Sequence, residues 1–447
     1  MEQDDDDVEL TEADFNAAMN WDDDTVASLT RDFVLSARTS KDAWNDLQIL
    51  SNLGDRTHAT VLGFLRDSAL YRRLVTTTGR YFVPEAPFNR ACLLLGESRG
   101  PETVDALAPF LNDPSEEIRK DAARAIARTG AVNMTPMINQ ALSDHEELVR
   151  SRALSGLKTA VSQSGLPAGI KEDLYSAVLR LLQRNQNAED AASTLYCCDS
   201  AKAIDFFCSN SVFTAQSPII DAVLRVLANE KCVIAPDKLK CLITDLERTD
   251  LQYSRSGALG TALRLLGQQQ RDEDRDFIRD RLTHMERAVA EGAAEGLVCS
   301  FGLDGFEQKI FEVTAQSGYE SLNRNQQLYS AVWICNIEIN NGGFSQYFSN
   351  SSGDTWPDAV ACLEAMGFHE RLAILREAID LFGEAGPSTD RSTRQDQLDE
   401  LLSMDESDEE DDDESIFDAL QDRYYNSSEV FEVFTCRFVL GNAEDFR

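Results

Sequence analysis

The stretch that decides the fold of the carboxyl-terminal third reads INNGGFSQYFSNSSG and spans residues 339–353. Ahead of it, apolar residues recur from Leu328 to Ile339 at steps of four, three and four, which places them on one stripe of a helix. The Asn-Asn-Gly-Gly run at 340–343 then predicts that this helix ends in a left-handed cap. We therefore expect a helix break inside the stretch.

Aromatic residues follow the glycines at helical spacing. Phe344, Tyr347 and Phe348 stand at positions i, i+3 and i+4, so a further helical turn gathers their rings on one face. Packing in a core, with Trp333 beside Phe344, is the ordinary role for such rings. An exposed recognition patch is the alternative.

A second break at 350–353 is followed by signs of further helices. Asp354 or Thr355 can cap a helix that has Pro357 near its first turn. Residues 370–382 repeat the apolar stripe of a helix. The carboxyl-terminal module is thus expected to be all-α.

The motif has a fixed set of residues, which marks a fold more than an activity. Its members are Asn340, Asn341, Gly342, Gly343, Phe344, Gln346, Tyr347, Phe348, Asn350 and Gly353. Together with FDALQDRYY at 417–425, this pattern resembles the C-terminal domain family named after a neisserial DNA-mimic protein, over roughly residues 305–447. That protein is acidic and helical and occupies the DNA-binding face of a transcription factor. The resemblance implies a helical fold and a DNA-binding protein as partner, although fold transfers more readily than function. The acidic run at 405–414 departs from the family pattern.

The middle of the chain carries internal repetition. LNDPSEEIRKDAA at 111–123 returns 31 residues later as LSDHEELVRSRAL at 142–154, with the Asp, the apolar-Arg pair and a small residue in register. The pattern resembles HEAT-type repeats, in which the Asp turn begins a helix and the Arg one turn later pairs within the repeat. Helix pairs of this kind bury apolar faces only against their neighbours, which predicts an irregular, HEAT-like α-solenoid.

Charge divides the chain into three parts. The net charge of −36 splits into −11 for residues 1–24, −4 for 25–304 and −21 for 305–447. We interpret these parts as an acidic, flexible amino-terminal segment, a HEAT-like α-solenoid, and a compact acidic helical domain with an acidic loop near 384–415. The excess of acid in the last part needs a cause beyond general solubility.

This acidic balance disfavours nucleic acid as a direct ligand, and we expect none. Duplex DNA carries one negative charge per about 1.7 Å of its axis, so its binders supply Lys and Arg. A domain with a net charge of −21 repels DNA and attracts the proteins that bind it. We therefore expect a basic protein partner, either a DNA-binding protein or a nuclease. No apolar run approaches the roughly 20 residues of a membrane span, so no membrane partner is expected.

Two sets of carboxylates are candidates for contact with such a partner. Acids fixed on helices can match the spacing of phosphates, whereas an acidic loop steers association. The ordinary alternative for the loop is a solvated stretch without a role in binding. The candidates are Glu364, Glu377, Asp380, Asp396, Asp399, Glu400, Asp408, Glu409, Glu410, Asp411, Asp412 and Asp413.

Patterns for catalysis and cofactor binding are absent from the sequence. It has no Walker loop, GxGxxG, nucleophile elbow or HExxH, and its four histidines are far apart, which disfavours a metal site. The ten cysteines lack paired CxxC motifs and are expected to be reduced thiols, several of them in helical cores. The amino terminus is acidic where a secretory signal is basic, so a cytoplasmic location is expected.

Three functions remain open. The first is a non-catalytic protein-binding module that acts as a DNA mimic or inhibitor on the basic surface of a nucleic-acid-binding protein. The alternative is a general HEAT-repeat scaffold or adaptor whose acidic ends serve solubility. The third is an enzyme whose site no motif reveals. Because catalytic patterns are missing, we expect no enzyme and no cofactor.

Overall fold

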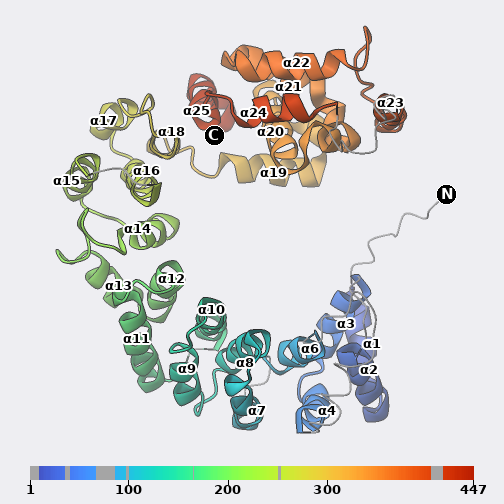
Figure 1. Cartoon of the computed structure of the whole chain (residues 1–447), viewed down its shortest axis with the longest axis vertical. Coiled ribbons are helices and arrows are strands. Elements are labelled where there is room, and N and C mark those ends of the chain that lie inside the picture. Colours follow the sequence, from blue (N-terminus) through green and yellow to red (C-terminus); the bar gives the residue numbers. More distant parts are fainter. Residues whose placement is uncertain are drawn as a thin grey trace. The chain divides into compact units, whose positions relative to one another are not determined.

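The computed structural model describes residues 10–35, 41–66, 86–96, 100–164, 166–249, 253–403 and 416–447. Within these ranges every regular element is an α-helix or a 3₁₀-helix, so the all-α prediction is confirmed (Figure 1). No helix in this part of the chain has both the length and the apolar character that a membrane crossing requires. Contacts between Cα atoms divide the chain into two compact units, Met1–Val226 and Leu227–Arg447.

The first unit begins with a group of short helices and continues as helix pairs. The opening helices are α1 (Glu12–Met19), α2 (Asp23–Leu35), α3 (Lys41–Asn52), α4 (Asp55–Arg66) and α6 (Ala86–Leu95). The pairs are α7 (Pro101–Leu107), extended by the 3₁₀-helix η1 (Ala108–Asn112), with α8 (Glu116–Thr129); α9 (Thr135–Ala141) with α10 (Glu147–Ser164); α11 (Ala168–Gln183) with α12 (Ala188–Cys198); and α13 (Ser200–Phe207) with α14 (Ile220–Asn229), which crosses into the second unit.

The second helices of successive pairs pack on each other. Helix α10 lies between α8 and α12 and contacts both (Figure 1). A glycine allows the close approach of α10 to α8, because a Cβ on Gly156 would lie 2.5 Å from the carbonyl oxygen of Arg124. Each helix pair buries its apolar face against the next, which is the arrangement of a HEAT solenoid. The solenoid prediction is confirmed.

An arginine in the repeat motif joins one repeat to the next. Arg119 of α8 donates from Nη1 to the carbonyls of Asp113 and Pro114 in its own turn, at 3.0 and 3.2 Å. Its Nε and Nη2 donate to the carboxylate of Asp144 in the following repeat, at 2.9 and 3.2 Å. Arg119 therefore bonds within its own repeat, as the resemblance implies, and its ion pair also joins that repeat to the next.

The next repeat uses the same device with a different acceptor. Arg150 donates from Nη1 to the carbonyls of Asp144 and His145, at 2.8 and 3.0 Å, and from Nε to Asn187 Oδ1 at 2.8 Å. Asn187 Nδ2 donates back to the carbonyl of Glu147 at 3.1 Å. An asparagine thus takes the place of the aspartate, which is one departure from the repeat pattern after the second copy.

The second unit contains two further helix pairs and then the carboxyl-terminal helices. The pairs are α15 (Pro236–Glu247) with α16 (Tyr253–Gln268), and α17 (Arg275–Arg279) with α18 (Arg287–Ser300). The later helices are α19 (Phe306–Ser317), α20 (Arg324–Ser349), α21 (Trp356–Met366), α22 (Glu370–Asp380), α23 (Arg391–Ser403), α24 (Asp418–Tyr425) and α25 (Phe431–Gly441). Thr355 stands at the N-cap of α21 and Pro357 lies in its first turn, as the sequence predicts.

One core runs through the carboxyl-terminal helices. It contains the predicted stripe of α20 from Leu328 to Ile339, and it also takes in Leu303 and the half-buried Val298 of α18. Helix α18 packs directly on α25. The predicted limits of the solenoid at 25–304 and of the last domain at 305–447 stay predictions.

Candidate partner-binding site in the carboxyl-terminal domain

The double glycine breaks α20 as the sequence predicts. Gly342 has φ −153° and ψ 20°, and Gly343 has φ 77° and ψ −172°, both outside helical values. The expected left-handed cap is wrong, because a left-handed residue has ψ near +47°. The conformation of Gly343 is instead one that essentially only glycine adopts. A Cβ at this position would also lie 1.9 Å from Gln421 Oε1.

The three aromatic residues after the break are buried in the core. Phe344, Tyr347 and Phe348 all have 0% exposure, which confirms core packing. The rings of Phe344 and Phe348 are stacked with their centroids 6.3 Å apart. Trp333, expected beside Phe344, instead lies edge-on against Phe311 at 4.7 Å.

Polar residues of the motif form hydrogen bonds between the two halves of α20. Glu338 precedes the break, and its Oε2 accepts hydrogen bonds from Gln346 Nε2 at 2.6 Å and from Asn350 Nδ2 at 3.0 Å. Bonds to an ionised carboxylate are stronger than neutral ones, so they fix the direction of the chain after the glycines. Asn340 and Asn341 are exposed.

A buried arginine that the sequence did not reveal organises the turn after α20. Arg394 of α23 has 0% exposure, and all three of its nitrogens donate hydrogen bonds. Its acceptors are the carbonyls of Phe348, Ser388 and Asn350 and the Oδ1 atom of Asp354, each at 2.7 Å. Gly353 leaves room for it, since a Cβ there would lie 2.7 Å from Arg394 Nε. The guanidinium is therefore part of the core, and no local signal distinguishes it from an exposed arginine.

A carboxylate clasp joins the start of α22 to the segment before α25. Glu429 accepts hydrogen bonds from the backbone N–H groups of three consecutive residues, from His369 to Arg371, at 2.5 to 3.0 Å. Glu370 in turn accepts from Ser427 Oγ at 2.8 Å. A carboxylate at a helix start satisfies free N–H groups and complements the helix dipole.

The turn after α20 forms one wall of a cavity of about 800 Å³. Four carboxylates line this cavity, those of Glu320, Glu338, Asp354 and Asp358. Arg391 is the cation among the lining residues. This composition is suited to holding a cationic group, provided that the carboxylates are free.

Three of these four carboxylates already have partners. Glu338 and Asp354 make the bonds described above, and Asp358 accepts from the hydroxyl of Tyr319 and from Arg324 Nη2, both at 2.7 Å. Burial acts to raise the pKa of Asp358, but these bonds outweigh it and leave the pKa below its ordinary value. Burial and the bond to Asp358 raise the pKa of Tyr319. The cavity thus has a structural polar network and no paired nucleophile and base.

The predicted partner-binding acids on the surface fall into two groups. In the first, Glu364 of α21 lies 3.4 Å from Arg376, and Glu377 of α22 accepts two hydrogen bonds from Arg423. The bonds from Arg423 hold the pKa of Glu377 below its ordinary value. Both carboxylates therefore have part of their charge offset by an arginine.

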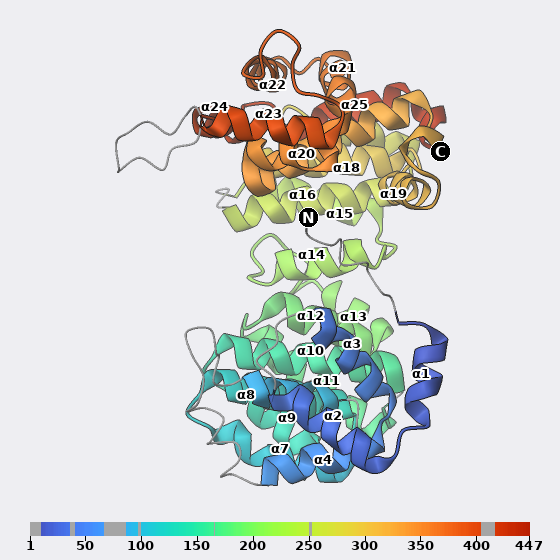
Figure 2. The same ribbon diagram turned by 90° about the vertical axis from the view of Figure 1, so that its right-hand side faces the viewer.

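The second group is exposed and has no ion pair within the described ranges. Its members are Asp380, Asp396, Asp399 and Glu400. The last three lie on α23, which packs on α20 through the buried Arg394 and Leu398 (Figure 2). Because these two residues are one turn apart on the inner face, the three acids lie on the outer face.

The predicted acidic loop near 384–415 is only partly described. Residues 391–403 form α23 and not a loop, because Leu398, Leu401 and Leu402 give them an apolar side that packs against the core. The remaining candidates lie outside the described residues; they are Asp408, Glu409, Glu410, Asp411, Asp412 and Asp413.

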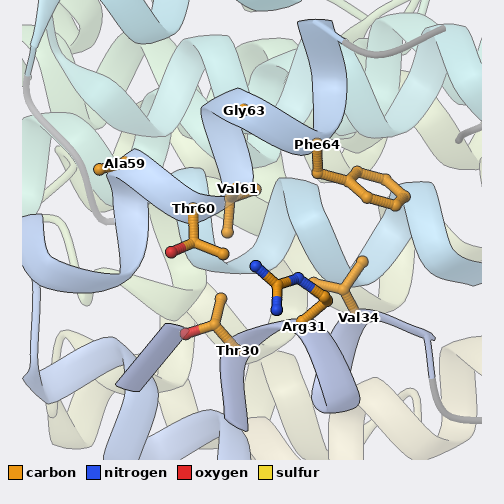
Figure 3. Close-up of a pocket in the computed structure, with 8 residues that line it drawn as sticks. All are labelled: Thr30, Arg31, Val34, Ala59, Thr60, Val61, Gly63 and Phe64. Atoms are coloured by element: carbon orange, nitrogen blue, oxygen red, sulfur yellow. The ribbon is translucent and has the colours of Figure 1, made fainter. Parts of the chain in front are cut away.

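A smaller cavity of about 280 Å³ lies between α2 and α4 in the first unit. Figure 3 shows the side chain of Arg31 reaching from α2 toward Thr60 and Val61 of α4. Its lining residues include no acid and no cysteine or histidine. Across the described ranges, no group of three histidine, cysteine or acidic side chains is arranged to hold a metal ion.

Comparisons with known proteins place families on two parts of the chain. Residues 320–440 match the DMP19-like proteins, and residues 89–158 match HEAT repeats. No curated protein matches the chain.

Three solved structures have low overall similarity. An engineered protein is 15% identical with a TM-score of 0.26, over 87% of this chain and 100% of its own. A chain of the Kap95:Nup1 complex is 11% identical with a TM-score of 0.35, over 99% of this chain and 55% of its own. A chain from a structure of Kap95p with RanGDP is 14% identical with a TM-score of 0.33, over 95% and 69%. The family matches and the helix pairs agree: residues 89–158 form HEAT repeats, and residues 320–440 form a DMP19-like domain.

Proposed function

We propose that the DMP19-like domain is a non-catalytic protein-binding module that occupies the basic surface of a nucleic-acid-binding protein. The observation that supports this most is the net charge of −21 in residues 305–447, combined with exposed carboxylates on a firmly seated helix. Such a domain competes with nucleic acid for a basic surface, because both offer closely spaced negative charge. The DNA-binding protein or nuclease that would be captured is recognised by charge.

The outer face of α23 is the best candidate for direct contact. Asp396, Asp399 and Glu400 are three and four residues apart, so neighbouring Cβ atoms are about 5–6 Å apart. Arg394 and Leu398 fix the helix beneath them. A partner that binds this face does not have to order it first, which lowers the entropic cost of binding.

Residues 404–415 add nine acids and no base directly after α23. In this proposal they contribute long-range attraction, which is screened beyond about 10 Å at 0.1 M salt. Association should therefore slow as ionic strength rises, while the dissociation rate depends mainly on the contacts of α23. A cytoplasmic location belongs to the same proposal.

A second candidate function is a HEAT-repeat scaffold whose acidic ends serve solubility. The observation that favours it is the exposure of two apolar side chains in the repeats: Val132, in the turn after α8, is 70% exposed, and Leu148, in the first turn of α10, is 51% exposed. HEAT repeats bind proteins along such surfaces. In this case the partner contacts the repeats and leaves α23 free.

Competition with DNA tests the two functions against each other. Proteins captured by the full chain from the native host are purified, and each is bound to the full chain with increasing duplex DNA. Displacement by DNA supports the mimic, whereas a partner that binds both at once rules it out and favours the scaffold.

Matched variants locate the contact. Replacing Asp396 and Asp399 by Asn and Glu400 by Gln should weaken binding by about tenfold or more, the loss expected for about 1.4 kcal/mol. The control removes three exposed acids from the solenoid, with Glu102→Gln, Asp173→Asn and Glu189→Gln. Equal losses in both triple variants would show that only total charge matters and would count against α23 as the contact surface.

A further inference from the structure

The adjacent helices α8 and α10 of the first unit depart locally from the acidity of the chain. Beyond Asp121 on α8 and Glu147 on α10, neither helix has an acidic residue. The same stretches carry five basic residues, which are Arg124, Arg128, Arg150, Arg152 and Lys158. In a chain with a net charge of −36, these parts of the two helices are therefore basic, and neither proposed function accounts for them.

Three of the arginines lie close to the point where α8 and α10 touch. Arg124 stands at that point, because a Cβ on Gly156 of α10 would lie 2.5 Å from its carbonyl oxygen. Arg128 follows one turn later on α8, and Arg152 precedes Gly156 by one turn on α10, so each is about 6 Å along its helix from the contact. Burial lowers the pKa of Arg124, and the neighbouring charges of Arg128 and Arg152 lower it further. We call these three residues the arginine face.

Two of the three guanidinium groups have no counterion in the protein. Arg124 is half-buried and Arg152 is exposed, and neither makes a hydrogen bond or ion pair with another residue in the described ranges. The charge of Asp121 acts on both arginines, but one carboxylate offsets only one cation. A half-buried guanidinium without a partner bears a desolvation cost, which a bound anion would offset.

The geometry of the arginine face favours a row of carboxylates over a single phosphate group. The cleft between α6 and α8 beside Arg124 and Arg128 has a volume of about 10 Å³, room for at most one water molecule, so a ligand has to lie over the surface. The arginines start about 6 Å apart along α8 and on a second helix whose axis is about 8–10 Å away. In an extended peptide, alternate side chains point the same way at a spacing of about 7 Å, which matches this spread. Each guanidinium can bind a carboxylate through two parallel hydrogen bonds.

We propose that the arginine face docks an extended acidic segment of a partner protein. Carboxylates of the segment accept hydrogen bonds from Arg124 and Arg152, and Arg128 adds positive charge beside them. Charge complementarity selects this occupant, because a short acidic segment brings few charges, whereas a long polyanion such as DNA is repelled by the net charge of −36. The site lies on the HEAT repeats and holds whichever of the two proposed functions is correct.

Fluorescence anisotropy with the full chain and short labelled peptides tests the kind of ligand. A peptide of alternating glutamate and serine should bind saturably, and more weakly as the salt concentration rises. The same peptide with glutamine in place of glutamate should not bind. Absence of saturable binding by the glutamate peptide would overturn the proposal. Tighter binding of a peptide with a single phosphoserine, or of a short DNA strand, would also overturn it, because the ligand would then be a phosphate group or a nucleic acid.

Matched double variants locate the site. Arg124→Gln with Arg152→Gln should bind the glutamate peptide about tenfold or more weakly, as expected for the loss of charge-assisted hydrogen bonds. Arg180→Gln with Arg184→Gln removes the same charge from two exposed positions at the carboxyl-terminal end of α11 and should bind like the unmodified chain. Equal losses in the two double variants would refute the site. Arg152→Gln alone changes only an exposed side chain, so it tests the site even if the double variant does not fold, and unaltered peptide binding in it would also refute the site.

Discussion

The HEAT repeats and the DMP19-like domain are both helical, but their polar contacts connect the chain in different ways. In the repeats, Arg119 and Arg150 each bind their own turn and the repeat that follows. In the domain, the contacts close large loops: Glu429 binds the start of α22 about 60 residues away, and Asn325 donates to Asp445, 120 residues away. The repeats are thus stabilised neighbour by neighbour, whereas the domain depends on a few contacts that close it as a whole.

The largest effect should come from the buried arginine of the domain. Arg394→Ala leaves four acceptors without their donor and should lower the free energy of unfolding by about 3–5 kcal/mol. Arg394→Lys should not restore it, because a lysine cannot reach acceptors in several directions at once. Calorimetric melting of the full chain measures the loss. Arg391→Ala is the control, because Arg391 is an exposed arginine of the same helix with one hydrogen bond, from Nε to the carbonyl of Ser349 at 3.2 Å. A loss of equal size there would contradict the role of Arg394.

The double-glycine break should come next. Gly343→Ala places a non-glycine residue at a strained φ and brings its Cβ against the side chain of Gln421. It should lower the free energy of unfolding by about 2–4 kcal/mol. Gly367 also has a positive φ, of 80°, but has open space around its Cβ, so Gly367→Ala should cost only about 1 kcal/mol. Urea unfolding compares the two. If Gly343→Ala keeps its stability and loses partner binding, the motif is a recognition site instead.

Within the repeats, the close approach of α8 and α10 predicts a smaller effect. Gly156→Ala forces α8 and α10 apart and should lower the free energy of unfolding by about 1–3 kcal/mol. Gly169→Ala, where a Cβ meets nothing within 4 Å, should be neutral or slightly stabilising. Thermal melting of both variants checks this. Equal melting temperatures for the two variants would mean that α8 and α10 can accommodate an added methyl group without loss of stability.

The contribution of the Arg119–Asp144 ion pair to stability should depend on pH. Burial acts to raise the pKa of Asp144, but the hydrogen bonds from Arg119 and from the backbone N–H of Glu146 together hold it below its ordinary value. A lowered pKa gives stability that is present above the unfolded pKa, near 4, and is lost as the pH falls through the folded pKa. Asp144→Asn should lower the free energy of unfolding by about 1–2 kcal/mol at pH 7. The variant should also lose less stability than the unmodified chain as the pH falls. Unfolding curves at several pH values between 2 and 7 measure both effects. If the variant loses as much stability at low pH as the unmodified chain does, the role of the Arg119–Asp144 ion pair is refuted.

The seam between α18 and α25 should respond to pH in the opposite sense. Burial raises the pKa of Glu432, with Glu291 and Glu295 adding to the rise and Arg287 opposing it. A raised carboxyl pKa makes the folded state bind the proton more tightly, so its contribution to stability falls as the pH rises through the folded pKa. Glu432→Gln should therefore raise stability at pH 7 by up to about 1 kcal/mol. A melting temperature lower than that of the unmodified chain would show that the carboxylate is needed.

Sequence patterns predicted those features whose cause is local. The apolar stripe of α20, the cap at Thr355 with Pro357, and the Asp-Arg repeat all depend on residues within a few turns of each other. Contacts between distant segments were missed, because Arg394 and Glu429 resemble ordinary surface residues in the sequence. The pairing of Glu377 with Arg423 was missed for the same reason, since 46 residues separate them.

The Glu429 clasp also has a consequence for the order of events during synthesis. The ribosome releases the residues of α22 well before Glu429, so the first N–H groups of that helix wait for a carboxylate made about 60 residues later. A HEAT pair, in contrast, can settle on the pair already made as soon as it emerges. The bonds that Glu429 makes to the start of α22 can therefore form only after translation has passed residue 429.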